Sequence, residues 1–262
     1  MNRVAFNIFG FNVYYYSLCI LLGVIVAYIL ITREGKKQGL PKEFISDLIF
    51  YTLIIGILGA RVYYCVFNLD YYLANPSEIL KIYNGGLAIH GGVIAGLIFV
   101  YFYTKKKNVS FIKVLDIVAP AVIIAQSFGR WGNFFNQEAH GEITTYQNLK
   151  NMHIPEFIIN GMHIEGKYYY PTFFFESIWC LIGFIILMIA RRNKNLRKGF
   201  QIGFYFIWYG IGRFFIEAFR TDSLMFFGLK IAQIVSLIGI IIGIIIIVTN
   251  RNKKYYNEME VK

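Results

Sequence analysis

The chain has 262 residues, of which 57% are hydrophobic and only 16% are charged. Ordinary soluble domains carry about 25% charged residues, so this composition excludes an ordinary soluble enzyme or binding module. The formal net charge of +11 is typical of nucleic-acid binding in a soluble protein. Its distribution along this chain is instead that of a membrane protein, and no nucleic-acid partner is expected.

Most of the hydrophobic residues fall into seven blocks, the majority about 19 to 23 residues long. About 20 apolar residues in a helix cross the hydrocarbon core of a bilayer. Because that core offers no water to the backbone, helix is the structure expected for each block. The chain is therefore predicted to be a single all-α, polytopic transmembrane domain over residues 1–262, with about seven transmembrane helices. The predicted spans are Val13–Ile31, Ile45–Phe67, Gly86–Thr104, the short Val114–Phe128, Thr172–Ala190, Gln201–Phe219 and Leu229–Val248.

Basic residues alternate between the connections that join these spans. Connections 33–42, 105–113 and 191–198, together with the tail from Arg251, hold 17 of the 26 Lys and Arg residues. The alternate connections and the N-terminus hold seven. Because basic connections stay in the cytoplasm, we predict an N-terminus outside and a cytoplasmic C-terminus, which requires an odd number of spans.

The first span lacks the small-residue cleavage site of a signal peptide, and we expect it to be retained. The three cysteines, Cys19, Cys65 and Cys180, all fall in predicted spans. Packing as small apolar side chains is favoured there over a disulfide or a reactive role.

A histidine lies just beyond an outer segment, Asn68–Gly85, whose tyrosines predict a position along the membrane interface. His90 has glycines on both sides in the stretch Tyr83–Gly92, and these permit close backbone approach and unusual torsions. An imidazole is a plausible general base, although an isolated His near a membrane surface is more often structural. A phosphate-binding P-loop is excluded because no Gly-Lys-Ser/Thr follows.

The densest polar cluster, Gly129–Gly141, lies at the outer end of the fourth span. Arg130 offers a planar fork suited to a phosphate, and asparagines such as Asn133 could orient ester or glycerol oxygens. A lone Arg at a span end is more often an anchor at the interface. Several polar residues together among glycines favour a binding site instead.

The same cluster begins a predicted outer-face insertion, residues 129–171, expected to form a small extracytoplasmic subdomain. Within it, residues 157–164 predict a β-hairpin with a two-residue turn at Asn160-Gly161. Glycines spaced by four also recur in the spans, and they predict close packing between helices of one chain in preference to a dimer interface. These pairs are Gly92/Gly96, Gly199/Gly203 and Gly239/Gly243.

Three charged residues of the sixth span, Arg213, Glu217 and Arg220, are spaced by four and then three, which places them on one helix face. Charge inside a span costs roughly 2.5–3.5 kcal/mol, so each residue needs a partner or a function. Arg213 and Glu217 could form a purely structural ion pair, but a cation remains after pairing and could bind an anionic ligand. Arg61 and Glu176, in two other spans, could pair with each other or with this stripe.

The stretch Gly129–Gly141 closely resembles the signature of the prolipoprotein diacylglyceryl transferase family, Gly-Arg-x-Gly-Asn-Phe-x-Asn-x-Glu-x-x-Gly. The elements Tyr15-Tyr16, His90-Gly91-Gly92 and 213–220 recur in the same order, so the resemblance runs from the first predicted span to the sixth. One departure precedes Glu176, where members of the family often carry a Gln and a Tyr and this chain has phenylalanines.

The resemblance implies a bacterial inner-membrane enzyme with its active site toward the outer face. It implies transfer of the diacylglyceryl group of phosphatidylglycerol to the lipobox Cys thiol of a preprolipoprotein signal peptide, with release of glycerol-1-phosphate. Cations at the outer surface would stabilise the charge of a phosphate leaving group. No metal and no cofactor are expected, and the partners are the two substrates and the lipid bilayer.

Residue roles follow by matching positions to the family pattern. Arg130 and Arg213 would hold the headgroup and its phosphate, and Glu217 would orient Arg213. His90 or Tyr16 would assist deprotonation of the thiol, although a thiolate could also form in a positive field alone. The further substrate-binding residues expected are Asn133, Asn136, Glu138, Gly141, Arg220, Arg61 and Glu176.

Three other functions are compatible with parts of the sequence. A transporter or channel for an anionic solute would use the same arginines. An intramembrane protease is disfavoured because Gly-x-Ser-Gly, His-Glu-x-x-His and Gly-x-Gly-Asp are missing from the sequence. A structural scaffold would explain Arg213 with Glu217, but not the cluster at Gly129–Gly141.

Overall fold

The structure, a computed structural model, describes residues 3–8, 10–82, 85–221, 225–226, 228–252 and 256. Tyr83 and Asn84 of the histidine stretch, and Lys253, Lys254 and Lys262 of the basic tail, lie outside the described residues. The chain divides into two compact units. The first comprises residues 1–31 and 115–258, and the second comprises residues 32–114 and 259–262.

Five of the described helices are long and apolar enough to cross a membrane, which confirms a largely helical, multi-pass membrane protein. The third and sixth predicted spans also form helices, α4 (Ile89–Lys106) and α9 (Phe200–Ala218), which are not among these five. The total of seven spans and the orientation of the termini therefore stay predictions. The five helices are α1 (Tyr15–Lys37), α2 (Lys42–Phe67), α5 (Phe111–Asn136), α8 (Thr172–Ala190) and α10 (Ile231–Asn250).

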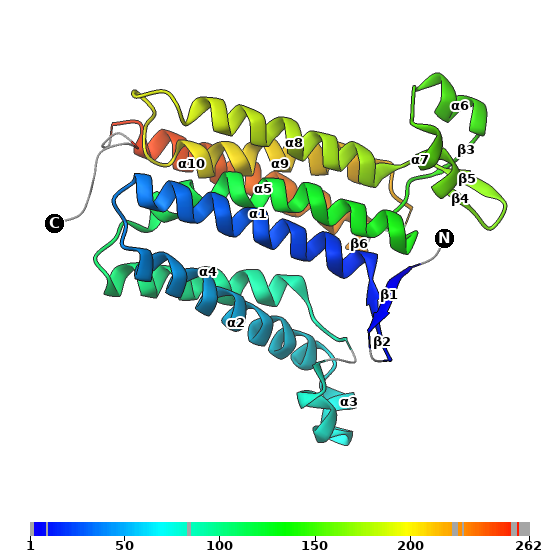
Figure 1. Ribbon diagram of the computed structural model, residues 1–262, viewed down its shortest axis with the longest axis horizontal. Coiled ribbons are helices and arrows are strands. Elements are labelled where there is room, and N and C mark those ends of the chain that lie inside the picture. Colours follow the sequence, from blue (N-terminus) through cyan, green and yellow to red (C-terminus); the bar gives the residue numbers. More distant parts are fainter. Residues whose placement is uncertain are drawn as a thin grey trace. The chain divides into compact units, whose positions relative to one another are not determined.

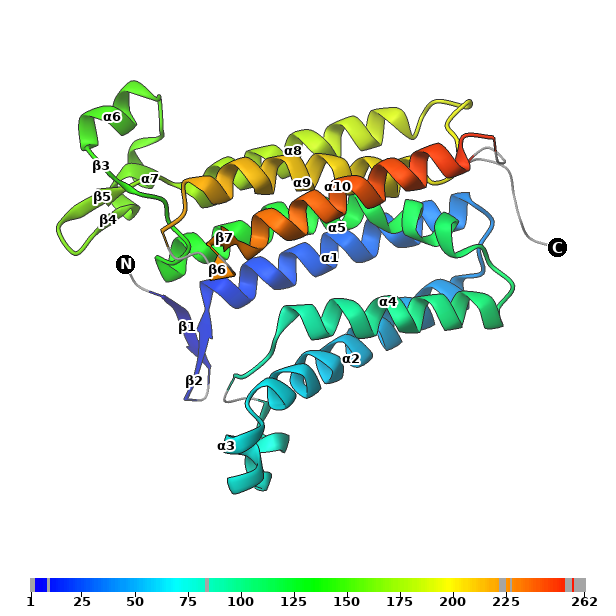
Figure 2. The same cartoon turned by 180° about the vertical axis from the view of Figure 1, so that it is seen from behind.

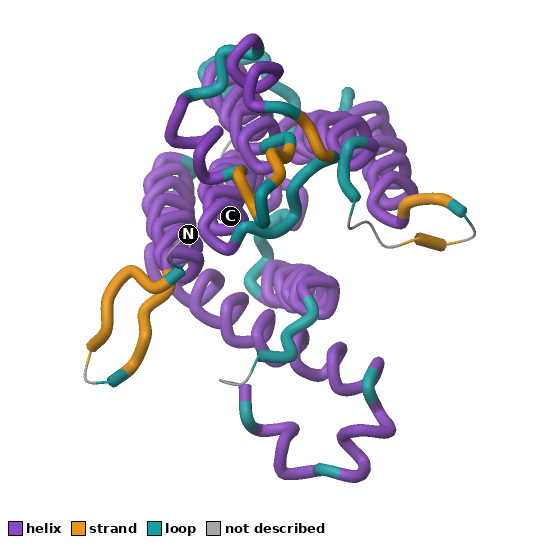
Figure 3. The backbone as a smooth tube through the Cα atoms, turned by 90° about the vertical axis from the view of Figure 1, so that its right-hand side faces the viewer, coloured by secondary structure: helices purple, strands orange, loops and turns teal. Residues whose placement is uncertain are grey.

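In the first unit, helices α1, α5, α8, α9 and α10 lie alongside one another, as Figures 1 and 2 show from opposite sides. The strands of this unit gather at one end of the helices, the end that faces the viewer in Figure 3. Three small antiparallel sheets form there, with strand orders β1-β2, β3-β5-β4 and β6-β7. The elements at this end are β1 (Val4–Ile8), β2 (Phe11–Tyr14), β3 (Ile143–Thr144), α6 (Tyr146–Asn151), α7 (Glu156–Gly161), β4 (His163–Ile164), β5 (Lys167–Tyr169), β6 (Met225–Phe226) and β7 (Leu229–Lys230).

Glycines hold α9 and α10 close together. A Cβ atom at Gly203 would lie 2.8 Å from the carbonyl oxygen of Gly243, and one at Gly243 would lie 2.5 Å from that of Gly203. Side chains at either position would force the two backbones apart. The prediction that glycines spaced by four serve packing inside the chain is confirmed for this helix pair.

The prediction of a short fourth span, Val114–Phe128, is wrong, because α5 continues as helix to Asn136. Glycine normally weakens the interior of a helix, yet the glycines at positions 129 and 132 both lie within α5. Gly132 instead faces the ring of Tyr16, where a Cβ atom would lie 2.6 Å from the ring carbon Cδ2. Residues 129–136 of the predicted insertion therefore form the last two turns of α5.

The predicted β-hairpin at residues 157–164 is also wrong. Residues 156–161 form helix α7, which buries Ile158 and Ile159 completely in a small core with Phe134. Tertiary burial of these two adjacent side chains thus outweighs the local turn signal of Asn160-Gly161. A hairpin does form a few residues later, where β4 pairs with β5 across Glu165 and Gly166, both with positive φ.

The second unit is built on α2 and α4, which also approach through glycines. A Cβ atom at Gly59 would lie 2.8 Å from the carbonyl oxygen of Gly91, and one at Gly92 would lie 3.0 Å from that of Gly56. Both glycines that follow His90 therefore serve close helix packing. The segment between α2 and α4 contains α3 (Leu69–Ala74) and the short 3-10 helix η1 (Pro76–Leu80).

Candidate active site

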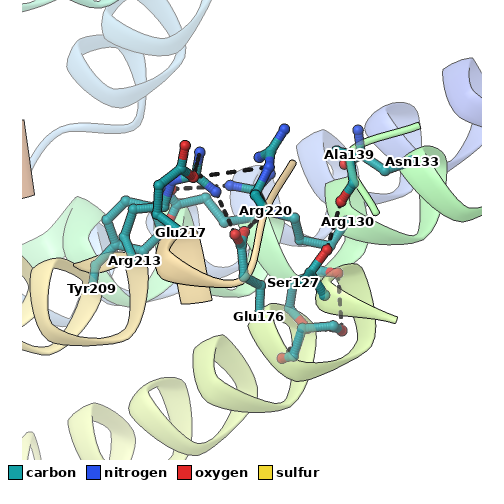
Figure 4. A network of polar contacts seen from close by, with 12 residues as sticks. Ser127, Arg130, Asn133, Ala139, Glu176, Tyr209, Arg213, Glu217 and Arg220 are labelled. Atoms are coloured by element: carbon teal, nitrogen blue, oxygen red, sulfur yellow. Dashed lines mark hydrogen bonds and ion pairs between the residues drawn. The ribbon is translucent and has the colours of Figure 1, made fainter. Parts of the chain in front are cut away.

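A buried carboxylate joins two arginines from different helices at the centre of the site (Figure 4). Glu176, near the start of α8, is only 4% exposed. One of its oxygens contacts Nε of Arg130 on α5, and the other contacts Nη1 of Arg213 on α9. A buried carboxylate is stable only when it is paired and hydrogen-bonded, so these three residues depend on one another.

The predicted stripe on α9 extends this arrangement. Glu217 is 3% exposed, and its Oε2 lies 2.6 Å from Nη2 of Arg213 and 3.8 Å from Nε of Arg220. The prediction of one shared helix face is confirmed for Arg213 and Glu217 and is wrong for Arg220, which lies beyond the end of α9 at Ala218 and reaches Glu217 from the following backbone. Glu176 was predicted to pair with Arg61 or with this stripe. In the structure it pairs with Arg213 of the stripe and also with Arg130, which the sequence had not indicated as its partner.

The five-residue set of three arginines and two glutamates carries a net charge of +1. We call it the arginine cluster: Arg130, Glu176, Arg213, Glu217 and Arg220. Tyr209, one turn before Arg213 on α9, accepts a hydrogen bond from Nη2 of Arg130 at 3.1 Å. A guanidinium has five N–H donors, so these contacts leave Arg130 and Arg213 with donors for an anionic ligand.

Two tryptophans lock α8 and α9 about one turn away from the paired Glu176 and Arg213. The indole N–H of Trp179 donates to the carbonyl of Trp208 at 2.8 Å, and that of Trp208 donates to the carbonyl of Trp179 at 2.8 Å. The rings stack with centroids 4.3 Å apart and an interplanar angle of 13°. The sequence reasoning missed this pair, which we call the tryptophan clamp. Its signal was a glycine four residues after each Trp, at positions 183 and 212, where a Cβ atom would collide with the partner indole.

The signature loop after α5 is organised around Glu138. Its Oε1 accepts hydrogen bonds from the side-chain amides of Asn133 at 3.0 Å and Asn136 at 3.3 Å. Gln137 and Ala139 both have positive φ, so the chain turns sharply on either side of Glu138. The structure therefore brings the three predicted residues Asn133, Asn136 and Glu138 together in one hydrogen-bonded group.

The end of the signature is joined to the end of the stripe through the backbone. Gly141 forms an isolated antiparallel bridge with Arg220, and its N–H donates to the carbonyl of Tyr170 at 2.9 Å. The hydroxyl of Thr172 donates to the carbonyl of Ala139 at 2.5 Å. A Cβ atom at Gly141 would lie 2.8 Å from Cβ of Tyr170, which explains the glycine at this position.

Tyr16 and His90 lie in different units. Tyr16, at the start of α1, packs against Gly132 of the signature, and the neighbouring Tyr15 stacks on Phe135 with centroids 4.6 Å apart. His90 is exposed in the first turn of α4 in the second unit, with its ring centroid 6.4 Å from that of Tyr63. The structure thus places Tyr16 beside the signature. His90 belongs to the second unit, together with its neighbour Tyr63.

Arg61 has a different role from the predicted one. It is buried in the second unit, and its guanidinium lies 5.2 Å from the centroid of the Tyr72 ring. Four of its five N–H groups donate to backbone carbonyls, which leaves little capacity for a substrate. The Arg61 side chain therefore holds in place the segment that leads from η1 to α4. The accepting carbonyls belong to Ile79 at 3.0 Å, Gly85 at 2.8 Å, Gly86 at 2.9 Å and Glu78 at 2.6 Å.

Replacing Arg61 by Lys is expected to destabilise the protein without removing any charge. A Lys ammonium cannot reach four carbonyls arranged around a planar fork, and each lost hydrogen bond from a charged group costs about 1.5–3 kcal/mol. Thermal unfolding in detergent should show a lower Tm for Arg61→Lys. Arg33→Lys, at an exposed position of the same unit, is the control and should leave the Tm unchanged. An unchanged Tm in Arg61→Lys would contradict the fastening role.

Comparison with known proteins identifies the family. The family model described as prolipoprotein diacylglyceryl transferase matches residues 3–249. The chain is 49% identical over 251 residues to proteins from Bacillus cereus (strain G9842) and Bacillus thuringiensis subsp. konkukian (strain 97-27), and 48% identical to one from Bacillus anthracis (strain CDC 684 / NRRL 3495). Each alignment covers 96% of this chain and 93% of the relative, and each relative is named phosphatidylglycerol–prolipoprotein diacylglyceryl transferase. Signature, arginine cluster and relatives agree, and the chain belongs to the prolipoprotein diacylglyceryl transferase family of transferases.

Proposed function

We propose that this protein transfers the diacylglyceryl group of phosphatidylglycerol to the thiol of the lipobox Cys of a preprolipoprotein. The thiolate sulfur attacks the glycerol carbon that carries the phosphate ester. A C–S bond forms, the C–O bond to the phosphate breaks, and glycerol-1-phosphate leaves with the electron pair. The observation that carries this proposal is the arginine cluster, in which α5, α8, α9 and the residue Arg220 just after α9 bring three guanidiniums around two carboxylates.

The arginine cluster stabilises the leaving group in this mechanism. Negative charge grows on the phosphate oxygen as the C–O bond breaks, and positioned cations in a water-poor site lower the energy of that transition state. Arg130 and Arg213 bind the phosphate with the N–H groups that their carboxylate partners do not use. Glu176 and Glu217 hold the two guanidiniums in place, and Arg220 adds positive charge beside Glu217.

The last turns of α5 and the signature loop that follows, residues 137–141, bind the polar part of the lipid. The amides of Asn133 and Asn136 and the carboxylate of Glu138 can exchange hydrogen bonds with the glycerol hydroxyls of the headgroup. Gly141 contributes by its backbone, since it joins this loop to Arg220. The loop and the arginine cluster would thus bind adjacent parts of one phosphoglycerol.

The substrate supplies the nucleophile, so the enzyme has to make a thiolate from a thiol whose pKa in a free cysteine is about 8.5. Tyr16 or His90 would assist this deprotonation, or the thiolate would form in a positive field alone. If His90 is the base, removing its imidazole leaves the substrate thiol to ionise unaided.

The His90→Gln variant tests that assignment. We expect transfer to slow and the rise of its rate with pH to move to more alkaline values, because the substrate thiol, with a free pKa of about 8.5, must then ionise without the imidazole. The profile is measured as initial transfer rate at saturating phosphatidylglycerol between about pH 5 and pH 9. His153→Gln, a substitution outside the signature and the arginine cluster, is the control. An unchanged profile in His90→Gln would leave Tyr16 or the positive field as the source of the thiolate.

We place the protein in the bacterial plasma membrane, with seven spans, the N-terminus outside and the active site toward the outer face. The asymmetry of the basic connections supports this orientation. The segment after α5, within residues 129–171, would then form the small extracytoplasmic subdomain. The lipid bilayer supplies phosphatidylglycerol, and the signal peptide carries the lipobox Cys.

One assay of the unmutated protein tests the function directly. Purified protein in detergent should release glycerol phosphate only when both phosphatidylglycerol and a lipobox peptide are present. The same peptide with Ser in place of Cys is the matched control and should give no release. A transporter of anionic solutes would release none with either peptide, and release that ignores the peptide would indicate a phospholipase.

A further inference from the structure

A second basic site lies at the other end of the first unit. The end of α8, the connection to α9 and the end of α10 enclose a cavity of about 340 Å³. Glu176 and Ala190 lie 14 residues apart on α8, which corresponds to about 21 Å along the helix. The cavity is therefore separate from the arginine cluster, by about two thirds of the roughly 30 Å thickness of a hydrocarbon core.

The lining combines positive charge with apolar surface. Arg197, Lys198 and Arg251 supply three cations, and no Asp or Glu is among the described residues that line the cavity. Leu196, Phe200 and Ile247 supply an apolar wall. Arg197 and Lys198 make other contacts as well, but a guanidinium or ammonium has several N–H donors and can hold more than one partner.

Exposed apolar side chains continue from the cavity along both helices that frame it. Ile185 and Ile189 on α8 are 48% and 63% exposed, and Ile244 and Val248 on α10 are 49% and 54% exposed. A free phosphate or nucleotide would gain nothing from such a surface, whereas an acyl chain would. Basic pockets at the ends of transmembrane helices are a known means of binding anionic lipid headgroups.

We propose that this cavity binds the headgroup of an anionic phospholipid, with its acyl chains along α8 and α10. The ligand class is a phosphodiester lipid with net negative charge, and the site is distinct from the proposed catalytic one. Under the proposed orientation the lipid belongs to the cytoplasmic leaflet. The inference concerns lipid binding alone, so it stands or falls independently of the transfer reaction.

The test uses phosphatidylserine as the anionic probe and phosphatidylcholine as the neutral one, with the full-length protein in detergent. Retained lipid is counted by native mass spectrometry over a concentration series. The test variant is Arg197→Gln/Lys198→Gln/Arg251→Gln. The matched control, Lys105→Gln/Lys106→Gln/Lys107→Gln, removes three exposed charges from the end of α4 in the second unit.

Each basic side chain near an anionic headgroup contributes about fivefold in affinity, so the test variant should bind one phosphatidylserine about 100-fold more weakly. The control should bind as the unmutated protein does, and phosphatidylcholine should not be retained at this site. Equal binding by test and control variants would overturn the proposal. Displacement of the lipid by an equal concentration of inorganic phosphate would overturn it in favour of a free-anion site. If the triple variant fails to fold, Arg251→Gln alone should weaken binding about fivefold, and no change in that variant would also overturn the proposal.

Discussion

Arg130→Ala is expected to lower the rate of diacylglyceryl transfer by about 100- to 1000-fold. Removing one positioned donor to a developing negative charge costs catalysis of this size in other enzymes. The variant also takes from Glu176 one of its two arginine partners and leaves the Tyr209 hydroxyl without its donor. Initial rates of glycerol phosphate release, with phosphatidylglycerol and a lipobox peptide, measure the effect.

Two further substitutions make the Arg130 result specific. Arg192→Ala, at an exposed position in the connection after α8, should keep the full rate. Arg130→Lys keeps the charge and loses the planar fork, so it should fall between the unmutated protein and Arg130→Ala. A rate for Arg130→Ala within about threefold of the unmutated protein would remove Arg130 from the phosphate site.

Glu176→Gln is expected to destabilise the protein as well as inactivate it. Gln has nearly the shape of Glu, but it leaves Arg130 and Arg213 without the carboxylate that joins them in a buried site. Breaking a buried ion pair in this way costs about 3–5 kcal/mol, because a buried charge loses its compensation. The Tm in detergent should therefore drop, and transfer should fall to a small fraction of the original rate.

A double variant and a variant of the second glutamate are the controls for the Glu176 prediction. Arg130→Gln combined with Glu176→Gln removes one buried cation together with the carboxylate, so the double variant should be more stable than the sum of the two single changes indicates. A strictly additive loss of Tm would show that the two side chains do not interact. Glu217→Gln, which leaves Glu176 between its two arginines, should cost less stability than Glu176→Gln.

Helical periodicity was enough to predict the pairing of Arg213 with Glu217, because residues four apart lie on one face of a helix. It did not predict that α9 ends at Ala218, so that Arg220 contacts Glu217 from outside the helix. Glu176 could not be assigned a partner from the sequence, because its choice depends on how α5, α8 and α9 pack. Residue type alone did not separate Arg61, which holds backbone carbonyls, from Arg130, which holds a carboxylate.

Local signals misled where long-range packing decides the structure. The predicted fourth span stopped at Phe128, where the apolar block ends, but α5 continues through Gly132, which packs against the ring of Tyr16. Asn160-Gly161 is a strong hairpin signal, yet burial of Ile158 and Ile159 makes the segment helical. Both errors concern a contact with a residue far away in the sequence, which a local pattern does not contain.

The tryptophan clamp has a consequence for how a lipid reaches the arginine cluster. Each indole is bonded to the main chain of the opposite helix, so sliding or parting α8 and α9 breaks two hydrogen bonds and a stacked ring pair in one step. The gap between these two helices is therefore a poor lateral gate for a bulky diacyl lipid. Bilayer phosphatidylglycerol should approach Arg130 and Arg213 along a different helix boundary. A disulfide that joins α8 to α9 near the clamp should accordingly leave turnover intact.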